Sequence, residues 1–349
     1  MLRILTSFLF IHAAFIFVSG QTSGSFELNE TSRLLGTTVK EFPAPQGLSS
    51  FDDISSGPPS NLKITRRPLT GPTPLPSYEK RETVSSTAPD GTIYEGWSGR
   101  FEESNLYPGP EKLASNINPR QRYGTHFGYG FNPADVFIGR RVSGKIRTSL
   151  FFRDVGSHET APYYFTVDST GLVHLIVADV NISDNNELNV YSVVGDPKTG
   201  KWMDAVMLDR RGFTSQSHPW AGKLGDTVHL LWNWSDETYD KNNPSMGLFY
   251  VDWHASGYGR KKRLAAGTVK SYDAAIDLKS GQMLVVVTIG YRIYLMIRMA
   301  DGSWRRPSEI LPRPDENYSY DVSARSLGGG RFVVRASGLS GSEWLVAVR

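Results

Sequence analysis

Short runs of alternating apolar and polar residues follow one another along the chain, and after residue 20 no stretch shows the helical spacing of apolar positions. Alternation with a period of two predicts β-strands that have one buried face. From about residue 157 these runs come in pairs, and the turn inside each pair carries a glycine, at Gly171, Gly225, Gly281 and Gly328. The sequence therefore predicts an all-β protein that is built from repeated hairpins.

Each hairpin is followed by a third strand, and three of the four repeats add a fourth. Third strands are expected at 188–194, 248–253, 291–299 and 344–348, and fourth strands near 203–208, 262–265 and 308–311. Four antiparallel strands in roughly fifty residues are typical of one β-propeller blade. The runs "APDGTIYEGW", "DVFIGRR" and "KIRTSLFFRD" predict a further blade upstream. We expect five blades, or six if residues 120–133 contain another.

The last repeat ends after its third strand, which would leave one edge of that blade without a partner. Propellers protect such edges, so a strand from the N-terminal side is expected to complete the last blade. The two candidates for this closing strand are residues 61–69 and 80–84.

The N-terminal part divides into two segments before the propeller. Residues 1–20 combine a basic start, an apolar run and small residues at the end, which predicts a secretory signal peptide. Residues 21–60 are rich in Ser, Thr and Pro, and we expect a disordered leader. Residues 61–349 are predicted to form a single propeller domain. The protein is then secreted, extracellular (or periplasmic if bacterial), and has no membrane span after signal removal.

Composition narrows the possible partners. The chain has no cysteine, so an exported form must be stabilised by its core rather than by disulfides. A formal net charge of +3 does not indicate a nucleic-acid partner. The basic run at 260–263 is interpreted as a solvated turn, with contact to an acidic glycan as the alternative. No histidine spacing or phosphate-binding motif indicates a metal or a cofactor. Four asparagines fit the N-glycosylation pattern, Asn29, Asn181, Asn233 and Asn317.

Two turns between third and fourth strands share a motif, "DPKTGKW" and "ADGSW". They resemble degenerate forms of the Asp-box of the BNR-repeat, sialidase-like β-propeller superfamily. The resemblance implies structural roles: the Asp caps the turn, the Gly takes a positive φ, and the Trp packs between blades. The residues concerned are Asp196, Gly200, Trp202, Asp301, Gly302 and Trp304. The catalytic motif of sialidases has no match, since the nearest string, "YRIY" at Tyr291, lies in a late blade and lacks the proline. True sialidase activity is therefore not expected.

The triplet Ser-Tyr-Asp occurs twice, at 271–273 and 319–321, each time at the start of a blade's first strand. In a propeller these strands line the central channel, so their ends meet at one mouth. The predicted ligand-binding residues there are His158, Glu159, His218, Tyr272, Asp273, Tyr320, Asp321 and Arg335. Two interpretations stay open: a polar ring that solvates the channel and bonds neighbouring blades, or a glycan site.

The first functional hypothesis is a secreted propeller that recognises carbohydrate at the channel mouth. The second is an extracellular glycoside hydrolase or polysaccharide lyase, with catalytic candidates Asp273, Asp321, His218 and Tyr320. A lyase would use Arg335 to hold a uronate, and His218, Tyr272 or Tyr320 to take the proton. The third is a scaffold that binds a protein partner.

Overall fold

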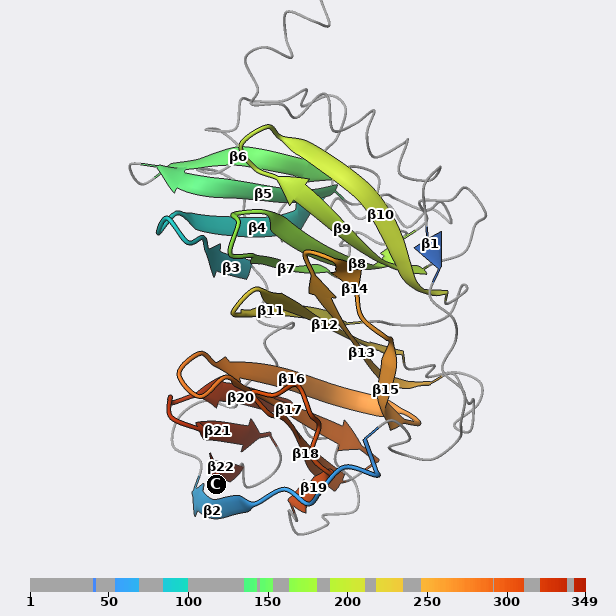
Figure 1. The fold of residues 1–349 in the computed structure, drawn as a ribbon, viewed down its shortest axis with the longest axis vertical. Helices are drawn as coiled ribbons and strands as arrows, with labels where there is room; N and C mark the ends of the chain where they lie inside the picture. The colour runs from blue at the N-terminus through green and yellow to red at the C-terminus, as the bar shows by residue number, and fades with distance from the viewer. Residues whose placement is uncertain are drawn as a thin grey trace, which may run out of the picture. The chain divides into compact units, whose positions relative to one another are not determined.

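The structure is a computed structural model. It describes residues 40–41, 54–68, 84–99, 135–142, 145–152, 163–180, 189–210, 218–234, 246–290, 292–310, 321–337 and 342–349. Every regular element in these residues is a β-strand, which confirms the all-β class (Figure 1). In the described part of the chain, no helix has the length and apolarity needed to cross a bilayer. The predicted signal peptide lies outside the described residues.

The chain forms two compact units, of which the first comprises Met1–Glu41 and Glu82–Arg210. Its first sheet has the order β3 (Val84–Thr87), β4 (Ile93–Gly99), β5 (Asp135–Val142), β6 (Lys145–Phe152). Its second sheet runs from β7 (Tyr163–Val167) through β8 (Val173–Val180) and β9 (Asn189–Asp196) to β10 (Lys201–Arg210). The two-residue strand β1 (Lys40–Glu41) adds to β10 in parallel.

The second unit comprises Phe42–Arg81 and Arg211–Arg349, and its described residues form three sheets. One contains β11 (Pro219–Leu224), β12 (Thr227–Trp234), β13 (Gly247–His254) and, both paired with β13, β14 (Gly257–Tyr258) and β15 (Lys262–Ala266). The next contains β16 (Val269–Asp277), β17 (Gln282–Ile289), β18 (Arg292–Arg298) and β19 (Ser308–Ile310). The last has the order β2 (Leu62–Pro68), β22 (Ser342–Val348), β21 (Arg331–Ala336), β20 (Val322–Ser326).

The four-stranded antiparallel arrangement of the predicted blades is confirmed, and so is the closing strand. β2 pairs antiparallel with β22 along its whole length, from Leu62 opposite Val348 to Pro68 opposite Ser342. The candidate at 61–69 is therefore the closing strand, whereas the 80–84 region leads into β3 of the other unit. Five sheets are present in the described ranges, and the blade count of the whole protein stays a prediction. The boundaries at residues 20 and 60 also stay predictions.

Apolar side chains pack between neighbouring sheets inside each unit. In the first unit, Ile138 and Leu150 of one sheet share a buried cluster with Leu175 and Tyr191 of the next. In the second unit, residues of the β16–β19 sheet such as Val286 pack with the last sheet. The closing strand joins this second core through Leu62 and Ile64, which are partly buried against it. Because the alternate residues of β2 are exposed, its packing follows the period of two in the sequence.

Several long connections within each unit leave the end of the sheets at which the first strands begin. Antiparallel pairing fixes this end, because the second strand of a sheet finishes where the first began. These connections comprise residues 100–134 and 153–162 in the first unit, and 235–246 and 311–321 in the second. The hairpin turns at the other end are short, such as Gly225–Asp226 between β11 and β12.

Replacing Ile64 by Asp is expected to lower the free energy of unfolding by about 2–4 kcal/mol, because a carboxylate would enter the apolar contact between β2 and its core. Urea unfolding followed by tryptophan fluorescence measures the change. The matched control is Thr65→Asp, one residue further along β2 on the exposed face, and we expect a change within about 0.5 kcal/mol. Equal effects of the two variants would contradict the described packing of β2.

Candidate functional site

The Ser-Tyr-Asp triplet of β16 bonds this strand to the neighbouring sheet. Ser271 Oγ accepts a hydrogen bond from the Val322 amide at 3.1 Å, and Asp273 Oδ2 accepts one from the Ala324 amide at 2.9 Å. Asp273 Oδ1 also accepts the Ala274 amide. β20 is the edge strand of its sheet, so its outward N–H groups have no strand to pair with. The two side chains of β16 supply the missing acceptors.

Tyr272 points the other way, toward the sheet that contains β11 and β12. Its hydroxyl donates to the carbonyl of His218 and, at 3.4 Å, to that of Leu231. The His218 amide in turn donates to Asn233 Oδ1 at 2.8 Å. The Asn233 amide is buried, so the folded chain does not present this predicted glycosylation position to solvent. These contacts fix the backbone at the start of β11.

Tyr272 and Asp273 are fully or almost fully buried, with exposed fractions of 0% and 1%. Their polar atoms form hydrogen bonds between neighbouring sheets. This agrees with the first interpretation of the repeated triplet, in which its polar side chains bond neighbouring blades. We therefore assign both a structural role in the second unit. The side chain of His218 is half-buried, and it lies at the end of the sheet where the first strand begins.

The predicted Asp-box turns are built by their aspartates. Asp196 Oδ1 accepts the Lys198 amide at 2.8 Å, and Gly200 follows with a φ of 72°. Asp301 Oδ1 accepts the Ser303 amide at 2.8 Å and the Ser303 hydroxyl at 2.6 Å.

The tryptophans of these turns are buried between neighbouring sheets of their own units. Trp202 belongs to the cluster that contains Leu150 of the preceding sheet. Trp304 makes an edge contact with Tyr250 of β13, with 5.1 Å between the ring centroids. Gly302, which precedes this tryptophan in its turn, has a φ of 84°. Both turns thus have a structural function in the described chain.

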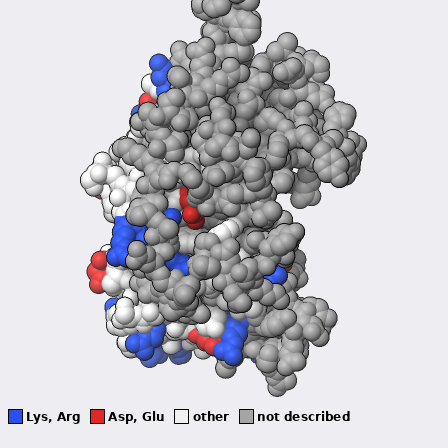
Figure 2. All heavy atoms as spheres, turned by 90° about the vertical axis from the view of Figure 1, so that its right-hand side faces the viewer, with Lys and Arg blue, Asp and Glu red and all other residues white. Residues whose placement is uncertain are grey.

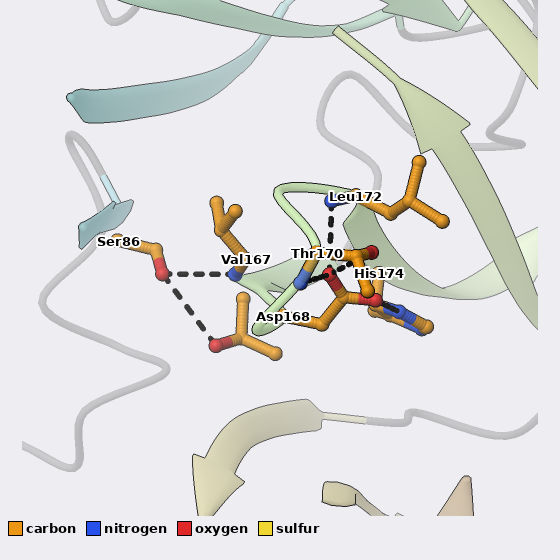
Figure 3. Close-up of polar contacts among 7 residues, drawn as sticks. Ser86, Val167, Asp168, Thr170, Leu172 and His174 are labelled. Carbon is orange, nitrogen blue, oxygen red and sulfur yellow. Dashed lines mark hydrogen bonds and ion pairs between the residues drawn. The ribbon is translucent and has the colours of Figure 1, made fainter. Parts of the chain in front are cut away.

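A buried carboxylate organises the β7–β8 hairpin (Figure 3). Asp168 Oδ1 accepts the amides of Thr170 and Leu172 at 2.8 and 2.9 Å, and Asp168 Oδ2 lies 2.8 Å from His174 Nε2. Burial alone would raise the pKa of Asp168, but the bonds from His174 and Thr170 outweigh it and lower this pKa to about 2. In the same view, Ser86 Oγ of β3 accepts the Val167 amide at 2.9 Å.

His229 of β12 stands between Val228 and Leu230, as His174 stands between Val173 and Leu175, and it is also fully buried. Its Nδ1 lies 2.8 Å from the Tyr250 hydroxyl, and that hydroxyl donates its proton to Asp252 Oδ2 at 3.2 Å. Burial, together with the nearby Arg298 guanidinium, lowers the pKa of His229 to about 3. Such an imidazole is neutral at physiological pH, so its role in the fold is that of a packed and bonded core residue.

Two predicted site residues, Asp321 and Arg335, lie on one face of the last sheet. The register places Arg335 opposite Ser323, two residues after Asp321, so both point away from the core that contains Val322 and Val334. Arg335 Nε donates to Glu343 Oε2 of β22 at 2.8 Å. Glu343 was missed by sequence reasoning, because only the pairing of β21 with β22 brings it to this face.

The carboxylate of Asp321 differs from the other buried carboxylates described above. It is partly buried, and it has no hydrogen-bond donor among the residues that the structure describes. Burial raises its pKa above the ordinary value of 3.8. The backbone around it is fixed, because the Asp321 amide donates to Ser337 Oγ at 2.8 Å. A carboxylate on a fixed backbone, with no donor among the described residues, is suited to binding an external donor.

Three predicted site residues, His158, Glu159 and Tyr320, lie outside the described residues. The basic run at 260–263 is only partly solvated, since Lys261 and Arg263 are buried with exposed fractions of 6% and 1%. Lys261 Nζ lies 5.9 Å from the centre of the Phe249 ring, as in a cation–π contact. Within the described ranges, no three His, Asp or Glu side chains are grouped to hold a metal ion.

Comparisons with known proteins give only distant similarities. No protein-family model matches the chain, and no curated protein matches it. Among solved structures, a protein of unknown function from Dyadobacter fermentans has 11% identity and a TM-score of 0.44, covering 77% of this chain and 76% of its own. An α-L-arabinanase of Penicillium chrysogenum, complexed with arabinobiose, has 11% identity and a TM-score of 0.42, covering 85% and 84%. A family 117 glycoside hydrolase of Zobellia galactanivorans has 10% identity and a TM-score of 0.36, covering 82% and 90%. Such values transfer no activity to this chain.

Replacing Asp168 by Ala is expected to destabilise the protein by about 2 kcal/mol at neutral pH, because the buried His174 and two turn amides lose their acceptor. The folded pKa of Asp168 is depressed, so its contribution is present above about pH 4 and is lost as the pH falls through about 2. Urea unfolding of wild type and variant between pH 2 and pH 7 tests this. Asp90→Asn, in the exposed turn of the β3–β4 hairpin, is the control and should change stability far less. A wild-type advantage that persists unchanged at pH 2 would contradict the assignment.

Proposed function

We propose that this protein is a secreted, BNR/sialidase-like β-propeller that binds a carbohydrate where the first strands of its sheets begin. The observation that carries the proposal is the carboxylate of Asp321, which is partly buried and lacks a donor among the described residues. Sugar hydroxyls are hydrogen-bond donors, and a fixed carboxylate acceptor that is partly shielded from water binds them well.

The course of the chain supports this location. In the second unit, the connections 235–246 and 311–321 leave the same end of the sheets as Asp321, and binding residues are concentrated on such connections. Tyr320 directly precedes Asp321 in the 311–321 connection, where an aromatic ring could stack on a sugar. The proposed site thus comprises Asp321 and Tyr320 of the second unit, whereas the predicted residues His158 and Glu159 belong to the first unit.

A glycan-active enzyme is the second candidate. The raised pKa of Asp321 favours it, because a general acid must keep its proton near the working pH. Glu343 supplies a second carboxylate on the same face of the sheet, and glycoside hydrolysis uses a pair of carboxyl groups. If the protein is such an enzyme, Asp321 is the candidate general acid, whereas Asp273 and Tyr272 keep the structural role that their burial indicates.

Asp321→Asn is expected to weaken glycan binding by about tenfold, since an amide is a weaker acceptor than a carboxylate, with little effect on thermal stability. Asp273→Asn is the matched comparison on the first strand of the neighbouring sheet. It should lower the melting temperature, because its carboxylate accepts two backbone amides, while affinity at low temperature is retained. The glycan for these measurements is identified on a glycan array that records both retention of the protein and release of product.

An enzyme would show product release that Asp321→Asn lowers by orders of magnitude, whereas a binding protein would release none. If no glycan in a broad panel is bound or cleaved, the proposed function is wrong. It is also wrong if Asp321→Asn leaves affinity unchanged while Asp273→Asn abolishes it in the folded protein.

A further inference from the structure

The face of the last sheet that points away from its core is strongly basic. Five cationic side chains lie on it, Lys63, Arg67, Arg325, Arg331 and Arg335. Four of them are exposed, and Arg335 is half-buried. Figure 2 shows Lys and Arg, with Asp or Glu between them, at the lower end of its view. No dense basic run in the sequence produces this surface, because the five residues come from three strands.

The strand register arranges four of these cations in two matching rows across β2, β22 and β21, and Arg325 lies on β20 outside both rows. In one row, Glu343 of β22 lies between Arg67 and Arg335. In the other row, Ala347 of β22 lies between Lys63 and Arg331. The rows are four residues apart, which is roughly 13 Å along the strands, and the flanking strands are about 9.5 Å apart.

One row thus contains its own carboxylate and the other does not. Glu343 accepts from Arg335 at 2.8 Å, so the first row is internally neutralised in part. Ala347 has the same place in the second row but carries no charge, and neither Lys63 nor Arg331 forms an ion pair within the described ranges. Arg331 Nε donates to the Gly328 carbonyl at 3.3 Å, which orients the guanidinium without neutralising it. Two unpaired cations over a small side chain leave room for an external carboxylate.

We propose that this face binds an acidic polysaccharide and that one of its uronate carboxylates lies over Ala347, between Lys63 and Arg331. The inference rests on the proposed carbohydrate function and names its ligand class. Ala347 lies at the hairpin end of the sheet and Asp321 at the other end, so a single polysaccharide chain would extend along the sheet to reach both. Such a carboxylate would repeat the Arg335–Glu343 ion pair of the other row. A polyuronate carries a carboxylate on each sugar, so successive charges along the chain can also meet Arg325 and Arg67, which the structure leaves without acidic partners in its described part.

A second copy of the protein is a poor occupant of this face. Two such surfaces would place five cations against five, with Glu343 and the partly buried Asp321 as the carboxylates of each. Repulsion between these like charges opposes association of two copies, whereas an anionic ligand would be attracted to the same surface.

The decisive variant is Ala347→Glu, which would supply the missing carboxylate from the protein itself. It should weaken binding to polygalacturonate by about tenfold or more, since Lys63 and Arg331 would then be neutralised. The isosteric control Ala347→Gln adds the same bulk without charge and should change affinity by less than about twofold. Isothermal titration calorimetry of the full chain at low salt, with melting temperatures recorded in parallel, measures both.

Single charge removals test the same site without adding bulk. Lys63→Gln and Arg331→Gln should each weaken polygalacturonate binding several-fold and make it less dependent on salt. Lys279→Gln, at the exposed turn between β16 and β17 on another sheet of the unit, is the control and should leave affinity unchanged.

The outcomes separate this inference from the function on which it rests. The inference is supported if wild type binds polygalacturonate but not its fully methyl-esterified form. Binding to polygalacturonate must then be lost in Ala347→Glu and kept in Ala347→Gln. Equal binding to the charged and the esterified polymer would leave carbohydrate recognition standing and overturn the ligand class. If both Ala347 variants lose the same affinity for polygalacturonate, or if neither loses any, the proposed position of the uronate carboxylate over Ala347 is wrong. If wild type binds no polysaccharide, both proposals are wrong.

Discussion

The sheets of this protein depend on how the edge of each first strand is satisfied. β7 and β20 are edge strands, and part of their outward backbone N–H groups would be left without acceptors. The preceding sheet supplies them: Ser86 accepts the Val167 amide in the first unit, and Ser271 and Asp273 accept the amides of Val322 and Ala324 in the second. Short polar side chains on one first strand thus act as the hydrogen-bonding partner of the next. This explains buried hydroxyls and carboxylates where apolar packing alone would place valine.

Most of the fold could be predicted because its signals are local. Alternation located the strands, glycine marked the hairpin turns, and the unfinished last repeat required a partner, which β2 provides. Strands β1 and β14 escaped prediction, because each has two residues and no period can be detected in so short a segment. The burial of Lys261 and Arg263 was not predicted for another reason. Successive side chains in and next to β15 face opposite sides, so two residues of a continuous basic run face inward.

The candidate site was only partly accessible from sequence. The repeated triplet has the same letters at both positions, yet Asp273 meets the amides of an adjacent edge strand, whereas the Asp321 carboxylate has no donor in the described part of the chain. Identical local sequence therefore has two different environments, and only the neighbouring sheet distinguishes them. The basic rows are harder still to foresee, because they need the register of β2 against β22, which lie at opposite ends of the chain.

The pairing of β2 with β22 has a consequence for biosynthesis. The strands of the second unit that flank the first unit in sequence cannot be joined until β22 has been synthesised, because β2 pairs with Ser342–Val348. The first unit needs no residue beyond Arg210, so its sheets can form while translation continues. During that interval β2 remains an unpaired, partly apolar segment, and a long-range contact of this kind forms slowly. A nascent chain stalled before β22 would therefore be the species most in need of a chaperone.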